Sequence, residues 1–96
     1  MSRYHTLYDS TGTAKYQTIS TSGTSARSSA ITARRITVIG NGTAHFMAFG
    51  TSTVTASATN CVVPAGAVLD FNFVSGQYVA VIAASGSGYV TIIDSD

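Results

Sequence analysis

The stretch "RRITVIGNGTAHFMAFG", residues 34–50, decides the fold. In its first half Ile36 and Val38 share one face of an alternating run, which is typical of a β-strand. The glycine–asparagine–glycine at residues 40–42 tolerates positive φ and predicts a tight turn, so the whole stretch is expected to form a β-hairpin. Its second half, residues 43–50, is apolar on both faces. We therefore expect that strand to be central or covered on both sides.

Short alternating segments extend outward from this hairpin, and helical periodicity is nearly absent. The further expected strands are residues 14–20, 26–33, 78–85 and 89–96, together with a segment that breaks at Pro64, restarts at Val68 and carries Leu69, Phe71 and Phe73 as core residues. This count of seven to eight short strands predicts an all-β fold, a single-domain antiparallel β-sandwich or small jelly-roll-like barrel spanning residues 14–96.

Residues 1–13 lack a clear period and end in a cluster of turn-forming residues. We interpret them as an N-terminal arm whose only large anchors are Tyr4 and Tyr8, and we expect it to become ordered on contact with another molecule.

The composition favours a contact surface over a charged one. Hydrophobic residues make up 45% of the chain and charged residues only 9%, with a formal net charge of +1. Hydroxyls and amides cost less to dehydrate than ions, so such a surface suits protein contacts. Without a strong field, neither a nucleic acid nor a membrane is an expected partner. We also expect no signal peptide, and the single cysteine is compatible with synthesis in a reducing cytosol.

Groups that catalysis and metal binding require are sparse. The four acidic residues are all aspartates in separate segments, the histidines and the cysteine lack ligand spacing, and no Gly-x-Ser-x-Gly motif frames a nucleophile. We predict that the protein is not an enzyme and holds no cofactor or metal. The candidate residues for catalysis or metal binding are Asp9, Asp70, Asp94, Asp96, His5, His45 and Cys61. We expect Cys61 to be a small buried hydrophobic residue. The basic residues Lys15, Arg27, Arg34 and Arg35 are expected to form at most a partial basic patch.

The second half of the chain resembles a family of small accessory virion proteins of tailed bacteriophages, of the capsid decoration or cement type. Three features carry the resemblance: Phe49-Gly50-Thr51 before a loop of small residues, Val63-Pro64-Ala65-Gly66 leading into an aromatic strand, and the glycine-rich turns at residues 75–76 and 84–88 that flank a strand beginning at Tyr78. The resemblance implies a non-enzymatic protein that binds the assembled shell at the capsid surface, is made in the host cytoplasm, and has the major capsid protein and further copies of itself as partners. A homo-oligomer is expected, with a trimer slightly favoured over a dimer.

On this interpretation the arm and the small-residue loop make the contacts. The expected capsid or subunit interface residues are Arg3, Tyr4, Tyr8, Thr51, Thr53 and Thr55. Two alternatives stay open: a tail or head-fibre component of the virion, and a carbohydrate-binding β-module that uses an exposed Tyr78 or Tyr89.

Overall fold

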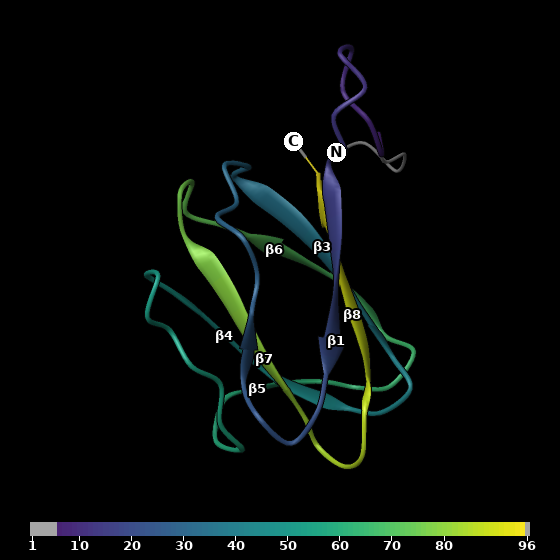
Figure 1. Cartoon of the computed structure of the whole chain (residues 1–96), viewed down its shortest axis with the longest axis vertical. Helices are drawn as coiled ribbons and strands as arrows, with labels where there is room; N and C mark the ends of the chain where they lie inside the picture. The colour runs from purple at the N-terminus through teal and green to yellow at the C-terminus, as the bar shows by residue number, and fades with distance from the viewer. Residues whose placement is uncertain (1–5, 96) are drawn as a thin grey trace.

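A computed structural model describes residues 6–95 and shows two antiparallel four-stranded sheets that face each other (Figure 1). The first sheet has the order β1-β8-β3-β6 and the second β2-β7-β4-β5. The strands are β1 (Tyr16–Thr21), β2 (Ala26–Arg27), β3 (Arg35–Asn41), β4 (His45–Gly50), β5 (Cys61–Val63), β6 (Val68–Asn72), β7 (Tyr78–Ala83) and β8 (Gly88–Asp94). The predicted all-β sandwich of seven to eight strands is confirmed.

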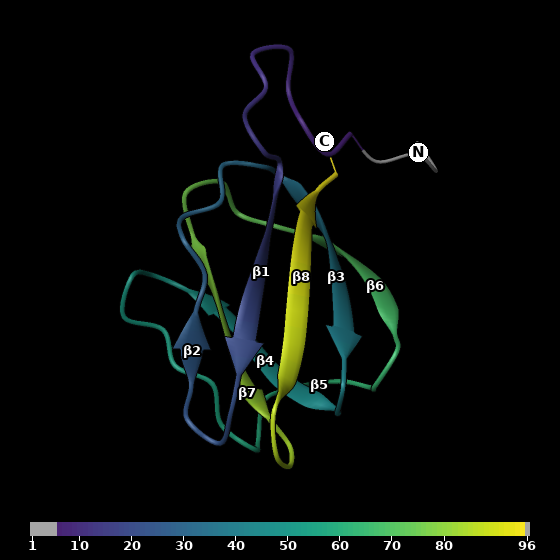
Figure 2. The same ribbon diagram turned by 45° about the vertical axis from the view of Figure 1, so that its right-hand side comes forward.

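The first four strands pair with the last four in reverse order, and the chain reverses direction between β4 and β5. The pairs β1–β8, β2–β7, β3–β6 and β4–β5 are all antiparallel. Two further antiparallel pairings, β3–β8 and β4–β7, join these pairs into the two sheets. An eight-stranded double sheet with this connectivity is a jelly roll. Figure 2 shows β1, β8, β3 and β6 side by side in the first sheet.

Alternation along each strand sends one row of side chains between the sheets. The core consists of Ile36, Val38, Val90 and Ile92 from the first sheet and Met47, Val63, Val79 and Val81 from the second, joined by Ile31, Ala33 and Phe73 from the connections. Phe49 packs edge-on against Phe71 and Phe73, with ring centroids 5.6 and 5.0 Å away. Leu69 and Phe71 are partly buried against the same core, so the predicted core triplet is confirmed.

The segment predicted as a strand over residues 26–33 is a strand only at Ala26–Arg27. The hydroxyl of Ser28 accepts a hydrogen bond from the backbone N–H of Val79 at 2.9 Å, while the N–H of Ser28 donates to the Val79 carbonyl. The side chain thus takes the place of a ladder carbonyl, and the regular strand ends there. The following residues cross to the start of β3.

The connection between β4 and β5, residues 51–60, folds over the outer face of the second sheet. Arg27 Nε donates to the Val54 carbonyl at 2.9 Å, and the N–H of Ala56 donates to Ser25 Oγ at 2.8 Å. The loop therefore reaches β2, although its ends belong to β4 and β5. Because β7 lies between β2 and β4, the loop crosses β7; it is the teal segment on the left of Figure 1.

Small residues on both sides make this crossing possible. A Cβ at Gly50 would lie 3.0 Å from the Val54 side chain, and Ala80, on the outer face of β7, is fully buried. The alternation of small residues in the loop turns Val54 and Ala56 toward the sheet and leaves Thr51, Thr53 and Thr55 exposed. The run of small residues in the sequence thus serves an intramolecular packing contact.

Candidate interaction sites

Residues 7–15 form a small β-hairpin that stands beyond the sandwich, at the top of Figures 1 and 2. The N–H of Lys15 donates to the Leu7 carbonyl at 2.7 Å, and the N–H of Asp9 donates to the Thr13 carbonyl at 2.9 Å. Gly12 closes the turn with a φ of 84°. We call this segment the N-terminal hairpin; it gives the described part of the predicted arm a structure within the single chain.

The Asp9 carboxylate holds the turn of the hairpin together. Its Oδ1 accepts hydrogen bonds from the Thr11 hydroxyl at 2.6 Å and from the N–H groups of Thr11 and Thr13, both at 2.9 Å. These donors, the Thr11 hydroxyl first, lower the pKa of Asp9 below its ordinary value of 3.8. The ionised form of Asp9 therefore stabilises the turn more than the neutral form does.

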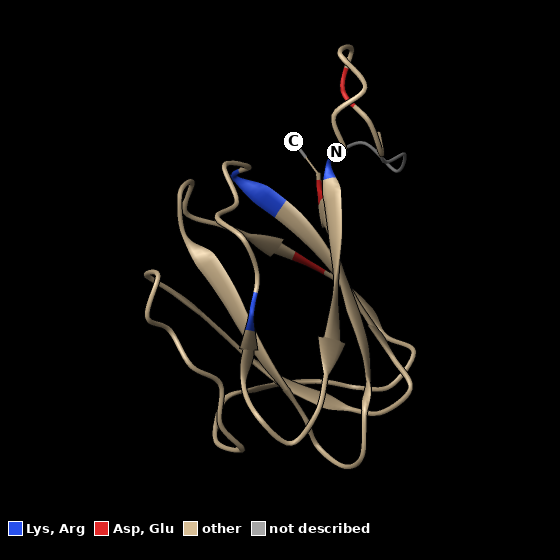
Figure 3. Ribbon diagram, viewed as in Figure 1, with Lys and Arg blue, Asp and Glu red and all other residues tan. Residues whose placement is uncertain are grey.

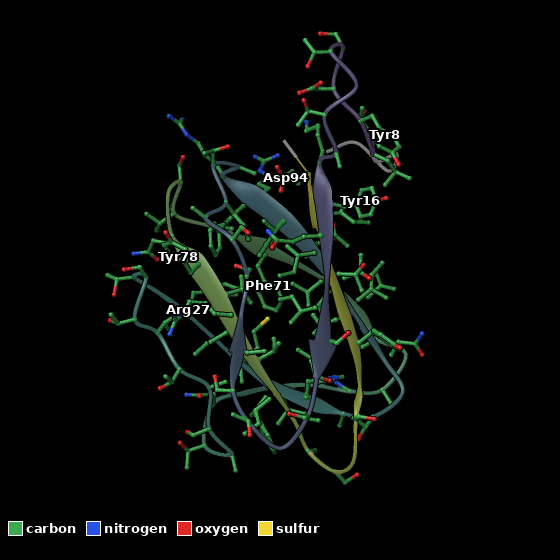
Figure 4. All side chains as sticks on the ribbon, viewed as in Figure 1. Tyr8, Tyr16, Arg27, Phe71, Tyr78 and Asp94 are labelled. Atoms are coloured by element: carbon green, nitrogen blue, oxygen red, sulfur yellow. The ribbon has the colours of Figure 1, made fainter. Side chains whose placement is uncertain are left out.

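The base of the hairpin presents aromatic and aliphatic side chains to solvent. Tyr8 packs edge-on against Tyr16, with ring centroids 5.9 Å apart, and their hydroxyl oxygens are 3.2 Å apart (Figure 4). Leu7 is 46% exposed and Tyr8 53% exposed. A protruding element with exposed apolar side chains is a candidate docking element.

The structure divides the predicted interface residues between two surfaces. Tyr8 lies on the N-terminal hairpin, whereas Thr51, Thr53 and Thr55 lie on the loop over the second sheet. Arg3 and Tyr4 lie outside the described residues. The assignment of all six residues to a capsid or subunit interface stays a prediction.

Charged side chains are distributed unevenly over the described residues. In Figure 3 the blue segments, which mark Lys and Arg, lie at the starts of β1 and β3, at the end that carries the hairpin, and on β2. No Lys, Arg, Asp or Glu occurs at residues 22–25, 36–69 or 84–88, which together include the turns at the opposite end. That end of the sandwich is therefore uncharged.

A pocket of about 350 Å³ lies at this uncharged end. It is lined by Ser20, Thr21, Asn41, Gly42, Ser87, Gly88 and Tyr89. Ser20, Tyr89 and Asn41 are aligned across three neighbouring strands in the register of the first sheet, so their side chains share its outer face. Tyr89 is 54% exposed. Sequence reasoning singled out Tyr89 as an exposed aromatic residue but missed its polar neighbours, which only the register brings together.

Two glycines let the turns at the rim of this pocket touch. A Cβ at Gly88 would lie only 2.3 Å from the carbonyl oxygen of Asn41, and a Cβ at Gly42 would lie 3.0 Å from the Cα of Gly88. Gly42 also has a φ of 90°, which L side chains rarely adopt. The close approach of the two turns therefore requires glycine at both positions.

Beneath the pocket, His45 is fully buried and pairs with Thr21. Its Nε2 lies 2.7 Å from Thr21 Oγ1, whereas its Nδ1 has no hydrogen-bond partner among the described residues. Burial lowers the pKa of His45 below its ordinary value of 6.5, and the backbone of Thr43 opposes this shift. A hydroxyl next to an imidazole is the start of a nucleophile–base pair, but a catalytic base is also held in place by a third group. No carboxylate occupies that position within residues 6–95. The pair therefore has the features of a packing contact.

The remaining candidates for chemistry do not converge within residues 6–95. Asp70 is aligned with Thr37 and Asp94 with Ile36, so the two carboxylates lie on opposite faces of one sheet. Asp70 accepts a hydrogen bond from the Thr37 hydroxyl at 2.5 Å. No group of three or more His, Cys, Asp or Glu side chains capable of holding a metal ion occurs there.

Cys61 corrects the prediction of a small buried hydrophobe, because it is exposed. It begins β5, a three-residue strand at the edge of its sheet, so only β4 covers it within that sheet. Cys61 is aligned with Met47, which is buried. Its burial was inferred from two neighbouring valines, one of which, Val62, is itself 51% exposed.

The fold and these surfaces define a small jelly-roll domain with a protruding hairpin and an uncharged polar pocket. No protein-family model, curated protein or solved structure matches the chain. Residues 6–95 include no helix of the length and apolarity needed to span a membrane.

Proposed function

We propose that this protein is a non-enzymatic structural component of a bacteriophage virion, a decoration or cement protein that binds the assembled shell and stabilises contacts between capsid subunits. The observation that carries the proposal is the N-terminal hairpin, which extends beyond the sandwich and exposes Leu7 and Tyr8. Docking of these side chains on another protein removes apolar surface from water, which favours association. The jelly roll is also an architecture of viral capsid proteins, although fold alone does not define function.

The composition of the surface supports a passive contact role. With only 9% charged residues, most of the exterior consists of hydroxyl, amide and small apolar groups. An interface between such surfaces closes without leaving ions unpaired. The molecule measures 37 × 26 × 23 Å, so one face is large enough for the ~800 Å² per partner of a standard protein interface.

The exposed threonines of the loop support a second contact, between copies of the protein. Thr51, Thr53 and Thr55 project from a loop that is fixed to the second sheet by Arg27 and Ser25. A contact surface away from the hairpin leaves the hairpin free for the major capsid protein. A closed homo-oligomer, with a trimer ahead of a dimer, matches the symmetry axes of an icosahedral shell.

Co-sedimentation of the purified full-length chain with capsids that lack it tests the proposal. We expect saturable binding at a stoichiometry that matches a symmetry class of the shell, and an oligomer in free solution. A few copies per particle would place the protein in the tail or a head fibre instead. Absence of binding to shell and tail alike would contradict a virion role.

A further inference from the structure

We propose that the pocket at Tyr89 binds a neutral saccharide, with one sugar ring packed on the Tyr89 side chain. This site lies at the end of the sandwich opposite the N-terminal hairpin and is independent of the proposed binding to a shell.

The side chains of the pocket match the surface of a sugar ring. A sugar ring has an apolar face made of C–H groups and a periphery of hydroxyls. Tyr89 provides a flat apolar ring that is 54% exposed, and Ser20, Asn41 and Ser87 provide hydroxyl and amide groups around it. A specific small-molecule site has this composition, an apolar contact surface with a few polar groups that fix orientation. The volume, about 350 Å³, is at the lower end of the range for ligand pockets.

The polar groups of the pocket are available to a ligand. Within residues 6–95 the side chains of Ser20, Asn41, Ser87 and Tyr89 make no hydrogen bond to the protein. Elsewhere on the same sheet face, exposed hydroxyls do pair, as Thr18 and Thr91 do at 3.0 Å. Binding a polyol at the pocket therefore breaks no intramolecular hydrogen bond.

The absence of charge separates this pocket from another pocket on the described surface. No lining residue of the Tyr89 pocket is acidic or basic, so nothing in it favours a phosphate, a carboxylate or a cation. That other pocket, of about 340 Å³ at the base of the hairpin, is lined in part by Lys15 and Asp94. The lining of the Tyr89 pocket therefore suits a neutral ligand better than a charged one.

The pocket is built on paired strands and on two turns in contact. Its aromatic and amide groups come from β8 and β3, and the contact of Gly88 with Asn41 fixes the two turns at its rim. The buried Thr21–His45 pair supports the lining from below. Preformed groups bind a ligand at a smaller ordering cost. Tyr78 is the other candidate aromatic residue. It is partly buried and is aligned with Gly50 in the β4–β7 pair of the second sheet.

The test is an NMR titration of the isotope-labelled full-length chain with neutral monosaccharides and disaccharides, and with a sugar phosphate as the charged comparison. We expect saturable shifts at the amides of residues 20–21, 41–42 and 87–89 with a neutral sugar, and weaker binding of its phosphate. Tyr89→Ala is expected to raise the dissociation constant about 10-fold or more, because it removes the ring contact. Tyr89→Phe keeps the ring and is expected to change it less.

Tyr16→Ala is the matched control, since Tyr16 is a second exposed tyrosine on the same sheet face but at its other end. It is expected to leave saccharide binding unchanged. Shifts that do not saturate, that centre on Tyr78, or that persist unchanged in a folded Tyr89→Ala protein would overturn the assignment. Shell binding is measured separately, so either result can stand alone.

Discussion

Tyr8 lies edge-on against Tyr16, the first residue of β1, so the N-terminal hairpin is fixed to the sandwich by one of the side chains that it exposes. The contact between the two tyrosine hydroxyls and the Lys15–Leu7 hydrogen bond also join residues at this junction. The hairpin is thereby held as a protruding unit, and its stability is separable from that of the jelly roll.

Replacement of Tyr8 is expected to loosen the hairpin alone. In Tyr8→Ala the edge contact with Tyr16 is lost, so the amides of Asp9 and Lys15 should exchange with solvent faster. The thermal midpoint of the sandwich should stay within the error of the wild type, because Tyr8 is absent from the core. Hydrogen exchange and calorimetry measure the two effects. Tyr89→Ala, at the other end, is the control, and unchanged exchange in Tyr8→Ala would contradict the account.

Acid is expected to open the turn of the hairpin. Because the pKa of folded Asp9 is below 3.8, the carboxylate stabilises the turn above pH 3.8, and this contribution is lost as the pH falls through the lowered value. The amide signals of Thr11 and Thr13 should report the change in an NMR pH titration. Asp9→Asn keeps an acceptor oxygen without titrating, so these signals should then lose their acid transition. If the acid transition of the Thr11 and Thr13 signals is unaltered in Asp9→Asn, a group other than Asp9 causes it.

The stability of the sandwich is expected to fall at mildly acidic pH because of His45. Its folded pKa is below 6.5, so the unfolded chain binds the proton more readily, and stability decreases as the pH drops below 6.5. Urea unfolding at pH 7.5 and pH 5 should show a lower midpoint at pH 5. The decrease should disappear in His45→Gln and persist in His5→Gln, which changes the only other histidine. Persistence in His45→Gln would show that a different group is responsible.

Gly88→Ala is expected to be strongly destabilising. A Cβ at Gly88 would meet the backbone carbonyl of Asn41 at 2.3 Å, and backbone atoms of a central strand cannot move aside cheaply. We expect a loss of about 2 kcal/mol or more in the free energy of unfolding. Gly23→Ala is the matched control, because a Cβ there has no neighbour within 4 Å, and its change should be within about 0.5 kcal/mol. Equal unfolding midpoints for the two variants would contradict this reading of the turn contact.

Turn residues, a proline and alternating apolar residues predicted the turns, one strand break and part of the core. The glycine–asparagine–glycine at residues 40–42 marked the β3–β4 hairpin, and Pro64 marked the break between β5 and β6. Alternation placed Ile36, Val38 and Phe73 in the core, where the structure has them. Each of these features depends on the preference of a few neighbouring residues, which a sequence displays directly.

Features that depend on distant residues were not predictable in the same way. The end of β2 is set by the hydroxyl of Ser28 acting on Val79, and the small residues of the loop match Ala80 of β7. The pocket at Tyr89 exists because the β1–β8–β3 register aligns three separate segments. Strand register and strand position in a sheet cannot be predicted from neighbouring residues alone. The exposure of Cys61 on an edge strand was missed for the same reason.

Occupancy of the shell by a hairpin variant tests whether the N-terminal hairpin attaches the protein to a capsid. The measurement is co-sedimentation of Leu7→Ser/Tyr8→Ser with capsids that lack the protein, compared with the wild type and with Val68→Ser, a control for an exposed apolar residue on β6. The account predicts that the double variant remains folded and binds at least about 10-fold more weakly, whereas Val68→Ser binds like the wild type. Full occupancy by the double variant would show that the N-terminal hairpin does not attach this protein to a capsid.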